Sequence, residues 1–181
     1  MGMFRRVDLP TGVGGFLVLH SMPGRNEPLQ KVWQEIDEVR IDCIVSLASL
    51  GEAREKSPEY ANAVADGGVP CDRLEFAVVD FGVPDDRAAF FAFARDLAGR
   101  LRAGQRLLIH CGAGVGRTGT LAICVLVALG GPLERAKRAV SAAGSSPETA
   151  PQRELVAWCA EQAGQRLTSN PAMQRTRCAG R

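Results

Sequence analysis

The sequence contains few of the residues that bind metals or build covalent frameworks. Its 181 residues include only two histidines, and the six cysteines form no C-x-x-C pair. A zinc site needs closely spaced ligands, and a disulfide framework is typical of short secreted chains, so neither is expected. The thiols are expected to stay free in a reducing compartment. We therefore predict no metal ion, no cofactor and a cytoplasmic location.

Long apolar segments and targeting patterns are also missing. The longest uninterrupted apolar run covers residues 121–129, far short of the ~20 residues that span a bilayer. Asp8 and Pro10 interrupt the stretch that follows Arg5 and Arg6, and no cleavage pattern follows, so no signal peptide is expected. An arginine at position 6 also argues against myristoylation. We predict no segment inserted in a membrane.

Charge of either sign is not in large excess. The formal net charge is +2, and residues 164–181 hold four arginines and no acid, which leaves 2 − 4 = −2 for the rest of the chain. Domains that bind nucleic acids carry a clustered basic surface. The charge therefore argues against a nucleic acid partner, and nothing in the sequence fixes the oligomeric state.

The order of predicted elements is that of an α/β protein. A chain of this length with 46% hydrophobic residues can bury one core, so we expect one domain over residues 1–163 and a basic, flexible tail over 164–181. Hydrophobic periodicity predicts strands at 15–20, 41–49, 73–79 and 106–110. It predicts helices at 27–40, 57–65, 86–102, 119–129, 132–143 and 151–163. The predicted fold is a central, mostly parallel sheet of four to five strands flanked by helices.

The stretch "LLIHCGAGVGRTGT", residues 107–120, carries the chemistry. An apolar strand leads into a tight glycine-rich loop and then into a helix that is apolar on every side. Backbone N–H groups and the positive end of the helix dipole then meet at one point, which binds an anion. Cys111 lies in this field, which favours the nucleophilic thiolate. Arg117 offers a planar fork for phosphate oxygens, so the pattern indicates transfer of a phosphoryl group to sulfur.

Three other interpretations of the same stretch are weaker. Residues 114–119 match the G-x-G-x-x-G dinucleotide fingerprint, but no second strand follows the helix. A nucleotide phosphate loop needs four residues between its glycines and a lysine, whereas three residues separate Gly112 from Gly116 and an arginine stands in the lysine's place. A buried cysteine at a glycine turn would leave Arg117 and the small loop residues unexplained.

The segment "HCGAGVGRTG", residues 110–119, resembles the H-C-x-x-G-x-G-R-[ST]-G signature of the cysteine-dependent tyrosine and dual-specificity phosphatase superfamily. The resemblance extends over about residues 15–160. It is strongest to the kinase-associated, dual-specificity-like branch, through "SMPGR", "SLASLGE" and "VVDFGVPD". It implies a phosphatase fold with a parallel-centred sheet and a reaction that uses no metal.

The resemblance also implies a role for each residue of the loop. Cys111 is expected to form a phosphocysteine intermediate, and Thr118 to donate a hydrogen bond to the departing thiolate. His110 is expected to orient the loop, although a histidine that is simply part of the core would look the same. The loop residues expected to hold the phosphoryl oxygens are Gly112, Ala113, Gly114, Val115, Gly116 and Arg117.

The leaving group needs a proton, so an acid is expected near the loop. Asp80 lies 31 residues before Cys111, and "VVDFGVPD" resembles the family's mobile acid loop. An aspartate at the end of a strand is often only a turn former, and the resemblance is what favours Asp80 as the acid. Asp85 and Asp86 are the alternatives. Two valines replace the family's Trp-Pro, so loop motion about that tryptophan is in question.

Two further features are partial matches. "ETAPQ", residues 148–152, resembles the family's Q-T-x-x-Q loop, whose glutamines position the hydrolytic water. Gln152 matches, whereas Glu148 replaces the first glutamine and would repel a phosphate. Cys43 and Cys124 are expected to pack as small hydrophobic residues. Some members of the family that the chain resembles protect the nucleophile by a disulfide, and the resemblance makes Cys43 the better candidate for such a bond to Cys111.

The predicted function is hydrolysis of phosphotyrosine, with lower activity on phosphothreonine or phosphoserine and with a phosphorylated protein as partner. No lysine lies within the phosphate loop, which argues against polyphosphorylated lipids, although Arg25 could reach the rim. The alternatives are a phosphatase for phosphoinositides or other small phosphate monoesters and a phosphate-binding regulatory pseudoenzyme. The basic tail could in addition serve as a docking element.

Overall fold

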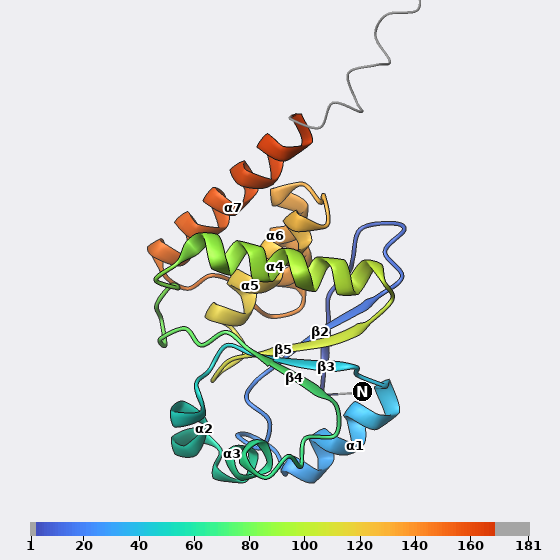
Figure 1. Ribbon diagram of the computed structural model, residues 1–181, viewed down its shortest axis with the longest axis vertical. Helices are drawn as coiled ribbons and strands as arrows, with labels where there is room; N and C mark the ends of the chain where they lie inside the picture. Colours follow the sequence, from blue (N-terminus) through green and yellow to red (C-terminus); the bar gives the residue numbers. More distant parts are fainter. Residues whose placement is uncertain (1–2, 169–181) are drawn as a thin grey trace, which may run out of the picture.

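The computed structural model describes residues 3–168, apart from the side chains of 166–168, and contains one five-stranded sheet (Figure 1). The strand order is β1-β2-β5-β3-β4; β1 pairs antiparallel with β2, and all other pairs are parallel. The strands are β1 (Arg5–Arg6), β2 (Phe16–His20), β3 (Cys43–Ser46), β4 (Asp72–Glu75) and β5 (Arg106–His110). The predicted α/β class with a mostly parallel central sheet is confirmed.

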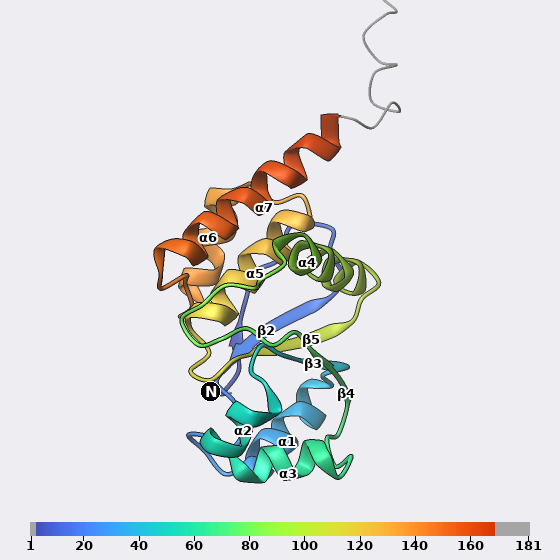
Figure 2. The ribbon, with the colours of Figure 1, turned by 60° about the vertical axis from the view of Figure 1, so that its left-hand side comes forward.

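Helices cover both faces of this sheet (Figures 1 and 2). One face carries α1 (Leu29–Val39), α2 (Leu50–Lys56) and α3 (Pro58–Ala65). The other carries α4 (Arg87–Arg102), α5 (Gly116–Ala128), α6 (Leu133–Ala142) and α7 (Ala150–Thr168). Successive side chains of a strand point to opposite faces, so Leu17 and Leu19 join the core beneath α4–α7 while Val18 joins the core beneath α1.

The central strand β5 positions the site. It lies between β2 and β3, parallel to both, and its side chains are buried except at its first residue. His110 ends the strand in register with His20 and Ser46, so the residues that follow emerge from the middle of the carboxyl edge of the sheet. Helix α5 then returns through the core, with nearly all of its residues buried. Ligands of open parallel sheets bind at this edge.

Several element boundaries differ from those predicted. The short helix α2 and strand β1 were not expected, because seven and two residues carry no readable period. Strand β4 ends at Glu75 rather than at residue 79, although the N–H groups of Phe76 and Val78 still donate to Ser46 O and Leu47 O before the chain turns at Asp80. Helix α7 continues to Thr168, so the first part of the predicted tail is helical, and residues 169–181 lie outside the described residues.

Two absences concern the part of the chain that the structure describes. No helix within it has the length and apolar character needed to cross a membrane. It also contains no cluster of three or more histidine, cysteine or acidic side chains able to hold a metal ion.

Candidate active site

Residues 111–117, the phosphate loop, connect β5 to α5. The Cys111 side chain is almost fully buried, and the N–H of Gly114 donates a hydrogen bond to its Sγ at 3.3 Å. Helix α5 begins at Gly116, and the first N–H groups of a helix have no partner within it. The loop therefore presents backbone donors and the positive helix end beside the sulfur, which is the arrangement from which the sequence analysis predicts an anion site.

The glycines of this loop are needed for close packing. Gly114 has a φ of 75°, and a Cβ there would collide with the backbone of His20. A Cβ at Gly112 would lie 2.8 Å from Glu52 Oε1 and 3.0 Å from Lys56 Nζ. Gly112 thus lets two charged side chains of α2 lie directly against the phosphate loop.

The Arg117 side chain is 2% exposed and is held by the carboxylate of Glu52, a residue that the sequence analysis did not assign to the site. Its Nη1 and Nη2 donate to the two carboxylate oxygens of Glu52 at 2.7 and 2.8 Å, and Nη1 also donates to Val78 O at 2.8 Å. Burial alone raises the pKa of Glu52, but the hydrogen bonds from Arg117 and Lys56 outweigh it and the pKa is lowered. Glu52 is therefore a carboxylate at neutral pH and fixes the plane of the guanidinium.

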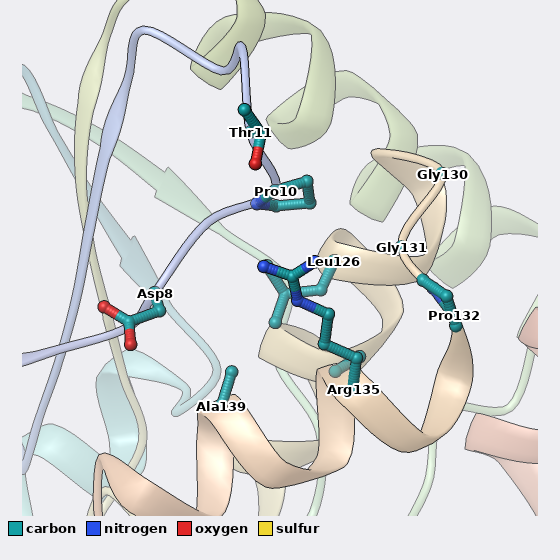
Figure 3. Close-up of a pocket in the computed structure, with 10 residues that line it drawn as sticks. Asp8, Pro10, Thr11, Leu126, Gly130, Gly131, Pro132, Arg135 and Ala139 are labelled. Atoms are coloured by element: carbon teal, nitrogen blue, oxygen red, sulfur yellow. The ribbon is translucent and has the colours of Figure 1, made fainter.

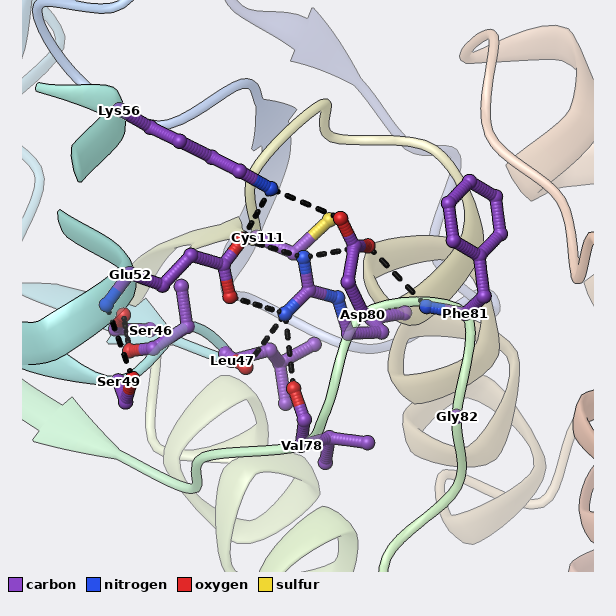
Figure 4. A network of polar contacts seen from close by, with 12 residues as sticks. Ser46, Leu47, Ser49, Glu52, Lys56, Val78, Asp80, Phe81, Gly82 and Cys111 are labelled. Atoms are coloured by element: carbon purple, nitrogen blue, oxygen red, sulfur yellow. Dashed lines mark hydrogen bonds and ion pairs between the residues drawn. The ribbon is translucent and has the colours of Figure 1, made fainter.

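Asp80 is brought to the same guanidinium. Its Oδ1 accepts from Arg117 Nη2 at 2.8 Å, and its Oδ2 accepts from Lys56 Nζ at 2.8 Å (Figure 4). Lys56 also donates to Glu52 Oε1 at 2.8 Å. Partial burial alone would raise the pKa of Asp80, but the Lys56 hydrogen bond and the Arg117 charge lower it. Two cations and two carboxylates thus form one network beside the phosphate loop.

Two buried polar atoms in the site lack a hydrogen-bond partner among the described residues. They are Nε of Arg117 and Oγ1 of Thr118. Leaving a buried donor unpaired is costly unless a ligand or water completes it. Both atoms belong to residues predicted to contact the phosphoryl group or the thiolate. No hydrogen bond joins Thr118 to Cys111 in this state, and the role of Thr118 stays a prediction.

The single tyrosine of the chain supports the loop through His110. Tyr60 Oη lies 2.9 Å from His110 Nε2, and His110 Nδ1 lies 3.2 Å from the carbonyl oxygen of Cys111. A carbonyl only accepts, so Nδ1 carries the hydrogen and the Tyr60 hydroxyl donates to Nε2. Complete burial lowers the pKa of His110 to about 3, so the ring is neutral. Arg73 Nε donates to the Tyr60 hydroxyl at 3.3 Å and completes the chain.

The loop that leads into α7 contacts the phosphate loop as well. A Cβ at Gly116 would collide with the Glu148 carboxylate, so that carboxylate lies against the start of α5. Gln152 is buried, and its Oε1 accepts from the N–H of Glu148 at 2.9 Å while its Nε2 donates to Gly82 O at 3.0 Å. In this state Gln152 ties the acid loop, residues 78–84, to α7, and its predicted part in holding water is not tested.

The two reserve acids occupy other places. Asp86 caps α4, with its Oδ1 accepting from the N–H groups of Ala88 and Ala89 at 2.9 Å each. Asp85 lines a cavity of about 290 Å³ beside Trp158, and no residue of the phosphate loop is part of that lining. Of the three aspartates, Asp80 is the one that the fold brings to Arg117.

Cys43 does not lie near the candidate nucleophile. It pairs in register with Leu107, four residues before Cys111 along β5, so it lies at the opposite end of the strands. A strand rises about 3.3 Å per residue, and a disulfide needs Cα atoms within about 7 Å of each other. The suggested protective disulfide between these two cysteines is therefore wrong for this fold.

The sequence analysis missed five residues that come from other segments of the chain and contact the phosphate loop or its neighbours: Arg5, Glu52, Lys56, Tyr60 and Ser145. One signal was available for Glu52, because Ser49 and Glu52 have the S-x-x-E spacing of a helix start, and the Ser49 hydroxyl accepts from the Glu52 N–H at 3.1 Å. That signal predicts helix α2. It does not predict that the Glu52 carboxylate turns to Arg117 instead of completing the capping box.

A cavity of about 200 Å³ opens far from this chemistry (Figure 3). It lies at the carboxyl end of α5, between Leu126 and Arg135, with Asp8 and Pro10 on its other side. The phosphate loop lies at the amino end of the same helix, which is about 20 Å long at 1.5 Å per residue. The lining of this cavity contains no residue of the phosphate loop and no cysteine, so the cavity is separate from the candidate active site.

Comparison with known proteins agrees with this geometry. A family model described as "Swiss Army Knife protein, DSP-PTPase phosphatase domain" matches residues 13–172. The chain belongs to this DSP-PTPase family. The resemblance that the residues of the phosphate loop indicate is thereby confirmed, and the domain is that of a cysteine phosphatase. Among curated proteins, none matches the chain at a significant level.

Solved structures share the DSP-PTPase fold at low sequence identity. Kinase associated phosphatase with its catalytic-site cysteine replaced by serine has a TM-score of 0.70 and 22% identity, over 92% of this chain and 96% of that chain. Tk-PTP in the active form has a TM-score of 0.65 and 24% identity, over 88% and 97%. PTPMT1 in complex with PI(5)P has a TM-score of 0.66 and 17% identity, over 92% and 99%.

Proposed function

We propose that the chain hydrolyses phosphate monoesters through a phosphocysteine intermediate and prefers phosphotyrosine in a protein or peptide. One observation carries the proposal: a buried cysteine directly after β5 lies near a fixed arginine fork, whose pKa burial acts to lower and the charge of the cysteine acts to raise, and a candidate acid binds the same fork. Candidate nucleophile, phosphate clamp and acid are therefore within one site. A regulatory pseudoenzyme that only binds phosphate does not need the candidate acid.

In the first step, the Cys111 thiolate attacks phosphorus while the bond from phosphorus to the leaving oxygen breaks. The incoming dianion competes with Asp80 for Nη2 of Arg117, because that nitrogen donates to Asp80 when no phosphate is present. Asp80, once protonated, gives its proton to the leaving oxygen. Glu52 keeps the guanidinium in plane, and the loop N–H groups stabilise the charge on the equatorial oxygens.

In the second step, a water molecule attacks the phosphocysteine. Asp80, now a carboxylate, takes a proton from the water as the new P–O bond forms and the S–P bond breaks. The departing sulfur returns as a thiolate beside the Gly114 N–H, and the unpaired Thr118 hydroxyl supplies a second donor. No metal ion takes part in either step. Each proton that Asp80 donates is therefore regained from water.

The charge around the pocket supports a substrate with a single phosphate. Arg117 and Lys56 provide two positive charges, and Glu52 and Asp80 provide two negative charges. One incoming phosphate uses the Arg117 fork, and no unmatched cation of this network is left for a second phosphate. Phe81, which is 61% exposed beside Asp80, offers its ring to the phenyl group of a phosphotyrosine.

Lys56 supports the alternative of a phosphoinositide or another small monoester. The phosphate loop itself contains no lysine, but Lys56 of α2 brings an ammonium group against Gly112. The sequence-based argument that no further cation lines the pocket is therefore incomplete. A similar structure, that of PTPMT1, holds PI(5)P.

The test compares three substrates at matched concentration without added metal: a phosphotyrosine peptide, a phosphothreonine peptide and a soluble phosphoinositide. We expect kcat/KM to be highest for phosphotyrosine, lower for phosphothreonine and lowest for the lipid. Cys111→Ser should abolish turnover but keep phosphate-analogue binding. A higher kcat/KM for the lipid overturns the substrate preference, and an active Cys111→Ser variant overturns the mechanism.

A further inference from the structure

The carbonyl oxygen of Gly114, on the outer side of the phosphate loop, accepts two strong hydrogen bonds. Arg5 Nη2 donates to it at 2.6 Å and Ser145 Oγ at 2.7 Å. Arg5 belongs to the edge strand β1, and Ser145 lies between α6 and α7, so three segments distant in sequence meet at one oxygen. Neither Arg5 nor Ser145 belongs to the phosphate loop, although both donate hydrogen bonds to it.

Arg5 also fixes the segment on its other side. Its Nη1 donates to the carbonyl oxygens of Ala143 and Gly144, at 3.1 and 2.7 Å, and to Ser145 Oγ at 3.1 Å. Gly114 and Gly144 both have positive φ, and a Cβ on either would lie within 3.1 Å of the guanidinium. The backbone is thus shaped on both sides to admit this one side chain.

The bond at Gly114 determines where the next N–H points. In a trans peptide the carbonyl and the N–H point in opposite directions. A Gly114 carbonyl directed outward to Arg5 therefore leaves the N–H of Val115 directed to the inner side, where the Gly114 N–H already meets Cys111 Sγ. If this peptide turned over, a carbonyl dipole would face the thiolate and the phosphate, and repel both.

Charge adds to this effect. Partial burial lowers the pKa of Arg5, whereas the charge of Cys111 acts to raise it. This attraction is a second link between Arg5 and the phosphate loop, beside the hydrogen bond to Gly114. Arg5 donates a hydrogen bond to the carbonyl oxygen of Gly114, whereas Arg117 donates one to Asp80. The two arginines therefore act on different parts of the same site.

We propose that Arg5 is a positioning residue of the phosphate loop, which with Ser145 holds the peptide between Gly114 and Val115 so that its N–H faces the phosphoryl group. The proposal rests on the proposed function for its catalytic consequence. Its structural part, the orientation of the loop around Cys111, is measurable without turnover.

The test uses Arg5→Gln, Arg5→Lys and Ser145→Ala in the full chain, with Arg6→Ala as control. Arg6 is the next residue of β1, is exposed, and lies over the Phe16 ring at 5.0 Å instead of at the site. We expect Arg5→Gln to lower kcat/KM for an aryl phosphate by about tenfold to a hundredfold. This loss is smaller than the ~10²–10³-fold loss of kcat that follows deletion of an oxyanion-hole donor, because the substitution changes the orientation of the Val115 N–H and does not remove it.

Two readouts separate positioning from simple loss of stability. The rate of Cys111 alkylation by iodoacetamide should fall in Arg5→Gln, because a turned Gly114 carbonyl would face the sulfur, and vanadate should bind more weakly. Arg5→Lys, which keeps a positive charge and a donor at this position, and Ser145→Ala, which keeps the Arg5 hydrogen bond to the Gly114 carbonyl, should fall between Arg5→Gln and wild type. Arg6→Ala should match wild type in every readout.

The outcomes are distinct. If Arg5→Gln alkylates, binds vanadate and turns over like Arg6→Ala, the proposal is overturned. If Arg5→Gln does not fold, the Arg5→Lys and Ser145→Ala variants decide, and wild-type alkylation profiles in both overturn it. If the wild type hydrolyses no phosphate ester, the proposed function fails, while the alkylation and vanadate readouts still decide on Arg5.

Discussion

Replacing Glu52 with glutamine tests the part of the site that the sequence did not reveal. The substitution keeps the shape of the side chain and removes the charge that faces the buried Arg117 guanidinium. Breaking a buried ion pair by removing one partner costs about 3–5 kcal/mol. We expect the lower end, about 3 kcal/mol, because Arg117 keeps the Val78 carbonyl and Asp80 as partners. At about 2–4 °C per kcal/mol for a domain of this size, Tm should fall by about 6–12 °C.

The same substitution should also reduce activity. Without the two-point contact to Glu52, the Arg117 fork is free to rotate toward Asp80, so it no longer meets the phosphoryl oxygens in a fixed plane. We expect kcat/KM for an aryl phosphate to fall by about tenfold or more, which corresponds to about 1.4 kcal/mol of transition-state stabilisation. Steady-state kinetics and thermal unfolding of the same preparations measure both effects.

The pH dependence of stability gives a further check, because the lowered pKa of Glu52 determines the direction of the expected change. The pKa of Glu52 is lowered in the folded protein from its ordinary value of 4.5, so the charge contributes stability above that value. The contribution is lost as the pH falls through the folded pKa, where the wild type becomes protonated as well. The difference in stability between wild type and Glu52→Gln should therefore be full at neutral pH and shrink below about pH 4.5.

Glu55→Gln is the matched control, because Glu55 lies on the same helix, is exposed and has no ion pair among the described residues. It should melt and turn over like wild type. A Glu52→Gln variant that melts at the wild-type temperature and keeps wild-type kcat/KM would refute the argument that this carboxylate holds the guanidinium.

Two predictions concern the acid. Asp80→Asn should lower kcat by about 10²-fold or more, within the ~10²–10⁴ range for a positioned acid, and the loss should shrink for leaving groups that need no proton. If Asp85→Asn shows this pattern in place of Asp80→Asn, the assignment is wrong. Lys56→Met removes a cation that lowers the pKa of Asp80. That pKa should rise, and the limb of the kcat profile that requires protonated acid should move to higher pH, whereas Arg54→Met, an exposed change on the same helix, should leave it in place.

The sequence predicts the contiguous part of the site well, and the structure explains why. Residues 110–119 lie on one strand, one loop and one helix, so their spacing alone determines that a cysteine, backbone donors and an arginine meet. The continuous apolar character of β2 and β5 likewise follows from burial on both faces of the sheet. These features are local, and a linear pattern is enough to find them.

The remainder depends on contacts that no linear pattern encodes. Glu52 and Lys56 reach Arg117 and Asp80 because α2 happens to lie beside the carboxyl edge of the sheet, and α2 is too short to show a period. Arg5 lies in a two-residue strand that exists only through its pairing with β2. Tyr60 is 50 residues before the histidine it contacts. Such residues are recognised only once the topology is known.

A side-chain hydrogen bond holds the backbone of the acid loop on each side of its central turn. Arg117 holds the Val78 carbonyl at 2.8 Å, and Gln152 holds the Gly82 carbonyl at 3.0 Å. Only residues 79–81 lie between these two anchors, and Val79 and Phe81 are 81% and 61% exposed. So short a span leaves little backbone free for a large movement. On the proposed mechanism, the displacement that admits a phosphate is therefore confined to the Asp80 side chain and the exposed tip of the loop, because Asp80 has to leave Nη2 of Arg117.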